Sequence, residues 1–485
     1  MPRRAFTRDQ AYLLPPSLDD WVPADHPVRF VAAFVDELTA ADWAELGVAS
    51  SGAWTGAPAY HPEVLLSVWL AGFMSGIRSV RALEAACRDQ LTFRWLTGNQ
   101  LPDHNTLWRF YDTHRRQLPH LFQLTVTTAW KAGLVEVALM AVDGTKVAGN
   151  VARAGMRDAE ALAALAEQAA ARIAELTAQV EAEGATAAPR LPSAVRQAQA
   201  LQDRIRAARQ VVTATDGPEQ ANPVDADARL LPTRQGWVAG YNAQAAVVAT
   251  PTVGDAPGGR VIVAVEVVTA EHDAGQLLPV RDAAVATLGQ APQTLLADGG
   301  YHRGADLAGC AARGQVVVMP EAQGDRLQDP THKDQFTYDA ETDRYTCPQG
   351  QPLRRQGTIH RTDRPTVQRY VMVEPHVCRT CPLVGRCTTD QRHGRTLEIG
   401  PADQALRAHR IWMATDDAEA LRRQRQTLIE PVFGILKERL GGRRFHTRGL
   451  AKVQVEWALL ATGFNLRTLW RAWRHGPGTA LLRTG

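Results

Sequence analysis

The stretch ALMAVDGTKV, residues 138–147, runs small apolar residues directly into Asp143-Gly144, and a related pattern returns as LLADGGY at residues 295–301. Asp-Gly after a strand-like run is a common hairpin turn, because both residues tolerate positive φ. The ends of buried strands are also where a fold can hold two carboxylates rigidly together. The segments around the two stretches decide between these interpretations.

These segments follow one another in the order β-β-β-α-β-α-β. The strand ending at Asp143 is followed by two more strand patterns, a helix, a strand ending at Asp298, a short helix and a last strand. The segments after the first are WVAGYNAQAAVVA (237–249), VIVAVEVVTA (261–270), AGQLLPVRDAAVATLG (274–289), QTLLAD (293–298), RGADLAGCAARG (303–314) and QVVVMP (315–320). This order is similar to that of the ribonuclease-H-like fold, which carries one acid on its first strand and a second at the end of its fourth. It predicts an α/β fold with a mixed sheet flanked by helices.

A site for phosphoryl transfer needs more than two acids. In two-metal catalysis several carboxylates hold a pair of Mg²⁺ ions roughly 3.5 to 4 Å apart, and the ions polarise the attacking and leaving oxygens. The stretch AEALRRQRQTLIEPVFGILKERLGG (418–442) predicts a helix after the last strand and offers Glu430 among basic residues. We therefore predict Asp143, Asp298 and Glu430 as the catalytic and Mg²⁺-binding acids. An ordinary exposed helix glutamate is the alternative for Glu430, and Pro431 beside it predicts a kink.

The length of 485 residues predicts several domains, and 45% hydrophobic with 22% charged residues is ordinary globular composition. No apolar run reaches the roughly 18 residues of a membrane span, so we expect no membrane partner. The N-terminal MPRRAFTRDQAYLL lacks the apolar core and cleavage site of a signal peptide. We expect a cytoplasmic protein.

Changes in composition predict the division of the chain. A helical N-terminal DNA-binding domain spans 1–130, and the first part of the catalytic core spans 131–324. Near-heptad apolar spacing predicts an inserted helical hairpin over 157–215. A cysteine-rich insertion follows over 325–415, and basic helices over 416–485 complete the core.

Two regions carry features of DNA-binding proteins. In LPDHNTLWRFYDTHRRQL (101–118), Asp103 is a plausible N-cap of a helix that could act as the second helix of a helix-turn-helix, or simply pack a helical bundle. Residues 421–485 hold 13 Lys or Arg against 3 Glu, which is the electrostatic footprint expected for phosphate backbones, although a solvated helix face is a common alternative. The predicted DNA-binding residues are Arg109, Arg422, Arg423, Arg425, Lys437, Arg443, Arg444 and Arg448.

Four of the six cysteines fall within 41 residues of one another: Cys347, Cys378, Cys381 and Cys387. The last three form a CxxC followed by a third thiol, and four thiolates suit tetrahedral structural Zn²⁺. The spacing is not that of a standard zinc finger, so a reduced cluster without metal is the alternative. A structural role is favoured over a catalytic one, because a site closed by four thiolates leaves no open position.

Over roughly residues 55–470 the chain resembles the DDE transposases of bacterial insertion sequences. The resembling stretches are YHPEVLLSVWLAGFMSGIRSVRALEAACRDQLTFRWLTG (60–98), PDHNTLWRF (102–110), AVDGTKV (141–147), VDADARL (224–230), GYNAQAAV (240–247), LADGGY (296–301), RQTLIEPVFGILKERLG (425–441) and RFHTRGLAKVQVEWALLATGFNLRTL (444–469). The resemblance implies Asp143, Asp298 and Glu430 as the catalytic acids, in agreement with the order of the elements. Related transposases often carry a tyrosine and an arginine where this chain has Arg423 and Gln426, so the basic role could pass to Arg422, Arg423 or Arg425.

The resemblance implies an enzyme that binds the ends of its own element, cuts a phosphodiester and joins the freed 3′-hydroxyl to target DNA. We expect two Mg²⁺ ions per active site, structural Zn²⁺, and a homo-oligomer assembled on DNA. A ribonuclease-H-like nuclease without strand transfer, and a DNA-binding derivative that has lost catalysis, are the alternatives.

Overall fold

The computed structural model describes residues 17–48, 59–183, 191–253, 258–321, 329–362, 365–390 and 392–475. Residues 1–16 of the predicted N-terminal domain, the turn 184–190 of the predicted helical hairpin and the basic residue Arg483 lie outside the described residues.

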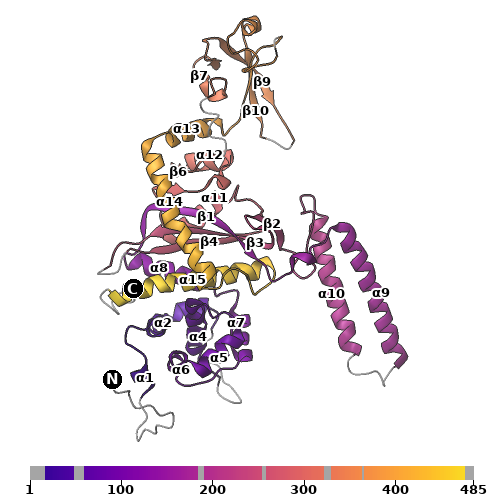
Figure 1. Ribbon diagram of the computed structural model, residues 1–485, viewed down its shortest axis with the longest axis vertical. Coiled ribbons are helices and arrows are strands. Elements are labelled where there is room, and N and C mark those ends of the chain that lie inside the picture. The colour runs from indigo at the N-terminus through magenta and orange to yellow at the C-terminus, as the bar shows by residue number, and fades with distance from the viewer. Residues whose placement is uncertain are drawn as a thin grey trace, which may run out of the picture.

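A six-stranded mixed sheet forms the centre of the molecule (Figure 1). Its strands run in the order β2-β3-β1-β5-β6, and β4 pairs with β3 beside β2. β3 pairs antiparallel with β1, β2 and β4, whereas β5 pairs parallel with β1 and β6. The strands are β1 (Glu136–Ala148), β2 (Arg229–Thr233), β3 (Gly236–Ala249), β4 (Arg260–Val268), β5 (Thr294–Leu296) and β6 (Val316–Val318). The ribonuclease-H-like fold class is thereby confirmed, with β2 as a short addition.

The N-terminal region is helical, as predicted. Its helices are α1 (Leu18–Trp21), α2 (Pro27–Asp36), α3 (Ala40–Glu45), α4 (Pro62–Ser75), α5 (Val80–Asp89), α6 (Leu91–Leu96), α7 (His104–His114) and α8 (His120–Lys131). Asp103 caps α7 by accepting a hydrogen bond from the backbone N–H of Thr106 at 2.6 Å. In that helix Leu107 and Tyr111 are buried, but Trp108 is 45% exposed and Arg109 is exposed. The helix therefore packs a bundle and also leaves a face open.

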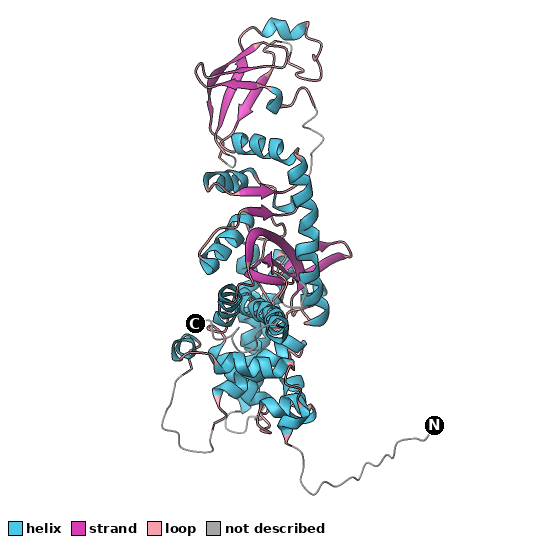
Figure 2. Cartoon of the chain, turned by 90° about the vertical axis from the view of Figure 1, so that its left-hand side faces the viewer, coloured by secondary structure: helices cyan, strands magenta, loops and turns pink. Residues whose placement is uncertain are grey.

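The C-terminal helices cover the sheet. Helix α14 (Asp416–Gly434) continues into a π-helical turn, η7 (Ile435–Arg439), and α15 (Leu450–His475) follows. Helix α14 lies against β1 and β5, whereas α11 (Leu277–Leu288) and α15 lie against β4. Turning the molecule by 90° shows α14 running alongside the strands (Figure 2).

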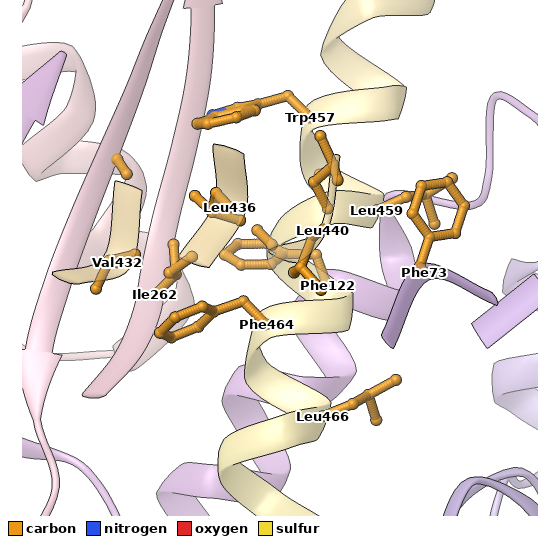
Figure 3. Packing of buried hydrophobic residues seen from close by; sticks show 14 of the residues in the cluster. Phe73, Phe122, Ile262, Val432, Leu436, Leu440, Trp457, Leu459, Phe464 and Leu466 are labelled. Carbon is orange, nitrogen blue, oxygen red and sulfur yellow. The ribbon is translucent and has the colours of Figure 1, made fainter. Parts of the chain in front are cut away.

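The helical N-terminal region and the sheet share one hydrophobic core. Phe73 of α4, Phe122 of α8 and Ile262 of β4 belong to the same buried cluster as side chains of α14, η7 and α15 (Figure 3). Among the buried residues of α15 are Trp457, Leu459, Phe464 and Leu466. Helix α15 therefore joins the two parts of the chain. Among the described residues no single helix meets the length and apolarity of a membrane span, although the bent pair α4 and α5 meets them together.

A buried ion pair reinforces this junction. Arg78, just after α4, donates to the carboxylate of Glu456 in α15, and the two side chains are 3% and 4% exposed. Glu456 also accepts from the backbone N–H groups of His446 and Thr447, at 2.8 and 2.9 Å. Arg78 donates as well to the carbonyls of Gly441 and Arg444. Because every oxygen of the carboxylate has a donor, the buried charge is compensated.

Two insertions project from the core (Figure 1). The first insertion, between β1 and β2 in the chain, consists of helices α9 (Ala159–Glu183) and α10 (Leu191–Val212). The two helices pack side by side and have their own small apolar cluster, which includes Leu162 and Ile205. After β6 comes a five-stranded antiparallel sheet with a separate core around Phe336 and Tyr370. Its strands are β7 (Thr337–Asp339), β8 (Arg344–Thr346), β9 (Pro352–Ile359), β10 (Val367–Met372) and β11 (Thr396–Ile399). Helix α13 (Asp403–Met413) then leads back toward α14.

We predict that Arg78→Met lowers the free energy of unfolding by about 3 to 5 kcal/mol, because removing one partner leaves a buried charge without its counter-ion. Urea denaturation of the purified chain measures this loss. Arg88→Met is the matched control, because Arg88 and Asp89 form an exposed pair at 3.8 Å, which should be worth less than about 1 kcal/mol. Equal effects of the two substitutions would contradict the role assigned to the buried pair.

Candidate active site

The pairing of β1 with β5 brings the two predicted aspartates together. The parallel register sets Ala141 opposite Leu296, and Asp143 and Asp298 each follow two residues later. Strand β5 ends at Leu296, so Asp298 lies beyond it and caps the 3-10 turn η3 (Gly299–Tyr301). Its Oδ1 accepts the backbone N–H of Gly300 at 2.8 Å. The Asp-Gly stretch at 298–299 therefore begins a turn at the end of a buried strand, whereas Asp143-Gly144 lies inside the long strand β1 and is not a hairpin turn.

Asp143 lies in a largely buried position beside a counter-ion. Its Oδ2 is 3.0 Å from Nη1 of Arg425 on α14, and both side chains are 16% exposed. The pKa of Asp143 is raised to about 6, because burial raises it, Arg425 opposes the increase and the charge of Asp298 adds to it.

Glu430, the third predicted acid, lies on α14 (Asp416–Gly434), the helix that also carries Arg425. Its side chain is exposed on α14, and the described residues supply it with no hydrogen bond or ion pair. Glu430 follows Arg425 by five residues, which is roughly 140° around a helix. Since Arg425 points toward Asp143, Glu430 points well to the side.

Pro431 lies inside helix α14, as the helix predicted over residues 418–442 requires. The helix runs through it to Gly434 and continues as a π-helical turn. Pro431 has no N–H to donate to the carbonyl of Thr427. That carbonyl instead accepts a hydrogen bond from Nε of Arg260 on β4 at 3.0 Å. The sheet thus satisfies the group that the proline leaves free.

The predicted DNA-binding residues differ in how they are held. Lys437 donates to the carbonyl of Lys146 on β1 at 3.3 Å, and burial lowers its pKa, with Arg443 lowering it further. Arg422, Arg423 and Arg443 form ion pairs with nearby glutamates. Arg444 and Arg448 donate to the backbone carbonyls of Gly149 and Asn150. The sequence offered Arg422, Arg423 and Arg425 as candidates for the basic role on this helix. Of these three, Arg425 is the one that contacts Asp143.

A polar network beside the aspartates was not foreseen from the sequence. Oδ1 of Asp273 accepts from the side-chain amides of Asn242 and Gln244 on β3, at 2.7 and 2.8 Å, and lies 3.4 Å from Nζ of Lys146. The hydroxyl of Tyr301 donates to the side-chain oxygen Oε1 of Gln244. The signal available in the sequence was the pair of amides inside the apolar strand segment GYNAQAAV, since buried polar groups need partners.

The four clustered cysteines line one cavity of about 280 Å³ in the cysteine-rich insertion. Sγ of Cys347 accepts the backbone N–H of Gln351, and Sγ of Cys381 accepts that of Leu383, each at 3.4 Å. Burial raises the pKa of Cys387, and the other three thiols raise it further while Arg395 opposes them. Across the described part of the chain, however, no group of three or more His, Cys, Asp or Glu residues is arranged to hold a metal ion.

Comparison with known families gives two matches. Residues 346–470 match the model described as the transposase DDE domain, and residues 16–113 match the transposase domain DUF772. Both matches support a DDE transposase of an insertion sequence. The first match contains Glu430 and the four clustered cysteines of this transposase, and neither match contains Asp143 or Asp298. No curated protein and no solved structure matches the transposase.

The match to the DDE domain supports an enzyme that acts on DNA, and that domain generally implies the use of a divalent metal ion. Because a proton and a cation compete for the carboxylate of Asp143, we predict that Mn²⁺ affinity falls about tenfold per pH unit below pH 6 and is constant above it. Titration of the purified transposase with Mn²⁺ from pH 5 to 8 measures this dependence. The Asp143→Asn variant should bind more weakly and lose the dependence near pH 6. A wild-type affinity that is flat across this range would contradict the assignment.

Proposed function

We propose that the transposase binds the ends of its insertion sequence, hydrolyses a phosphodiester there, and joins the freed 3′-hydroxyl to target DNA. The observation that carries the proposal is the β1–β5 register, which sets Asp143 beside Asp298 at the open end of a buried strand. Two carboxylates held this way on a rigid sheet suit phosphoryl transfer, which depends on positioning and on charge stabilisation. The match to the DDE domain supports the same chemistry.

The donor chemistry of the two aspartates fits Mg²⁺. Carboxylate oxygens are its preferred protein ligands, and it is usually held by one or two of them together with water and substrate phosphates. Asp143 and Asp298 would hold such an ion, with Glu430 as the acid that the family pattern adds. Bound there, the ion would supply Lewis-acid polarisation of the attacked phosphodiester.

The basic side chains around the site would position the DNA. Arg425 is held beside Asp143 and can offer a planar pair of N–H donors to a phosphate oxygen. Lys437 donates to the carbonyl of Lys146, three residues after Asp143 on β1, and provides a second positive charge. Arg422, Arg423, Arg443, Arg444, Arg448 and Arg109 are proposed to contact the backbone farther from the reacting phosphate. Contacts of this kind fix register and orientation rather than sequence.

The function can be tested with three acid variants in one assay. We predict that Asp143→Asn, Asp298→Asn and Glu430→Gln keep DNA binding and folding but lose cleavage and joining by at least about 100-fold, because each removes a charge that positions the reacting groups. The assay combines purified transposase, a labelled DNA duplex carrying the element's terminal sequence, Mg²⁺ and a target plasmid. Glu438→Gln is the control, since this exposed acid is paired with Arg443.

The outcomes separate the alternatives. Cleavage with joining supports transposition, whereas cleavage alone supports a nuclease. Binding without either reaction supports an inactive DNA-binding derivative. A Glu430→Gln enzyme that cleaves at the wild-type rate would show that the exposed glutamate is not the third acid, and a folded but inactive Glu438→Gln enzyme would point to the neighbouring acid instead.

We also propose that Cys347, Cys378, Cys381 and Cys387 hold a structural Zn²⁺ ion. The four thiols line one cavity, and backbone N–H groups already point at two of the sulfur atoms. Such donors stabilise the thiolate form, and thiolate is the form that binds zinc. The small core of this module, which includes Cys378 beside Tyr370 and Met372, offers limited apolar burial of its own. Metal binding would therefore supply part of its folding free energy.

We predict about one zinc per chain in natively purified transposase, measured by elemental analysis. Cys381→Ser should abolish the bound zinc and make the segment 329–399 sensitive to proteolysis, because the ligand set would be incomplete. Cys310→Ser, at a buried thiol outside this cavity, is the control and should keep the zinc. Native protein without zinc would favour the reduced cluster.

A further inference from the structure

A third aspartate approaches the active site from the opposite side of β1. Asp273 lies between β4 and α11, and its side chain is 18% exposed. Its Oδ1 receives all the donors of the network, namely the amides of Asn242 and Gln244 and the ammonium group of Lys146. Asn242 and Gln244 are fully buried. One oxygen of Asp273 is thus fixed by rigid groups of the sheet.

The second oxygen of Asp273 points to the same small space as Asp298. A methyl group built on Gly300 would lie 3.0 Å from Oδ1 of Asp298 and 3.4 Å from Oδ2 of Asp273. Both oxygens therefore border the volume above Gly300, which is itself exposed to solvent. The described residues provide Oδ2 of Asp273 with no hydrogen-bond donor.

Strand geometry explains how three aspartates reach one place. Successive residues of a strand point to opposite faces, so Asp143 points toward α14 while Gly144 and Lys146 point to the face where Asp273 lies. Gly144 leaves room for this approach, because a side chain there would collide with Asp273 and with the amide of Gln244. Asp298 follows the end of β5, two residues beyond the Ala141–Leu296 pair, and its Oδ1 borders the volume above Gly300. It can therefore be shared between Asp143 and Asp273.

We infer that Asp273 is a further catalytic carboxylate, which binds a divalent cation together with Asp298. The inference rests on the proposed function, since it concerns the metal-dependent step. Two carboxylates with water and a substrate phosphate are a usual Mg²⁺ environment, and two cations sharing one acid match the arrangement of two-metal sites. Asp273 would act in addition to Asp143, Asp298 and Glu430. The role of Glu430 is tested separately by the Glu430→Gln variant.

A purely structural role for Asp273 is the competing explanation, because a buried amide network could be retained to anchor Lys146. The two roles differ in what the free oxygen does. A structural aspartate needs only the fixed Oδ1, so its loss would lower stability without changing cation binding. A ligand would lose cation binding even where the fold is intact.

The test is a titration of the purified full-length transposase with Mn²⁺, followed by the electron paramagnetic resonance signal of the free ion. We expect Asp273→Asn to weaken Mn²⁺ binding by about 10-fold or more, the loss typical of a disturbed metal site, or to reduce the number of ions bound. Glu271→Gln is the matched control: it removes the same charge two residues away, from an exposed side chain, and should bind Mn²⁺ as the wild type does. If Asp273→Asn does not fold, Asp273→Ser is measured in its place, because serine keeps a small hydrogen-bonding group.

Asp143→Asn in the same titration separates this inference from the proposed function. Wild-type Mn²⁺ binding by a folded Asp273 variant, together with weakened binding in Asp143→Asn, would overturn the role of Asp273 and leave the proposed active site standing. A wild-type transposase that binds no Mn²⁺ would overturn both. Weakened binding in the Asp273 and Asp143 variants, but not in Glu271→Gln, is the result expected here.

Discussion

The parallel pairing of β1 with β5 is the constraint on which the rest of the active site depends. These two strands are separated by about 150 residues of chain, yet their register sets two aspartates side by side. A shift of one residue would turn one carboxylate to the other face of the sheet. The short β5 adds a second condition: because the strand stops at Leu296, Asp298 is free to begin the turn η3.

Burial makes the charged form of Asp143 less stable and so controls the protonation of this site. Asp143 has too little solvent to ionise at its ordinary pKa, and Arg425 compensates for only part of that loss. In the absence of a cation the guanidinium and the carboxylate neutralise each other. A divalent cation or a DNA phosphate would each favour one partner of this ion pair. The Asp143–Arg425 pair can therefore link metal binding to DNA binding, since relieving one charge makes the other available.

Much of the fold follows from local patterns in the sequence. The order of strands and helices, the N-cap at Asp103 and the inserted helical pair were all predicted, because each depends on periodicity or on one residue's hydrogen bond. The same is true of the proximity of Asp143 and Asp298, which follows from the order of the strands. Asp273 was missed, since its partners come from β1 and β3 and no local spacing connects them. The orientation of Glu430 was also beyond the sequence, because it depends on how α14 is rotated against the sheet.

The two insertions show how a long chain can return to one site. The helical pair and the cysteine-rich module leave the core after β1 and β6, and each has its own apolar cluster. The apolar clusters of both insertions are separate from the shared core, so the register of the sheet does not depend on their packing. After the second insertion, helix α14 packs back onto the sheet. It is held there by the ion pair of Arg425 with Asp143 and by its buried residues Ile429 and Val432. Helix α15 then fixes the end of the chain through Glu456 and Arg78. The geometry around Asp143 and Asp298 is thereby determined by contacts on both sides of each insertion.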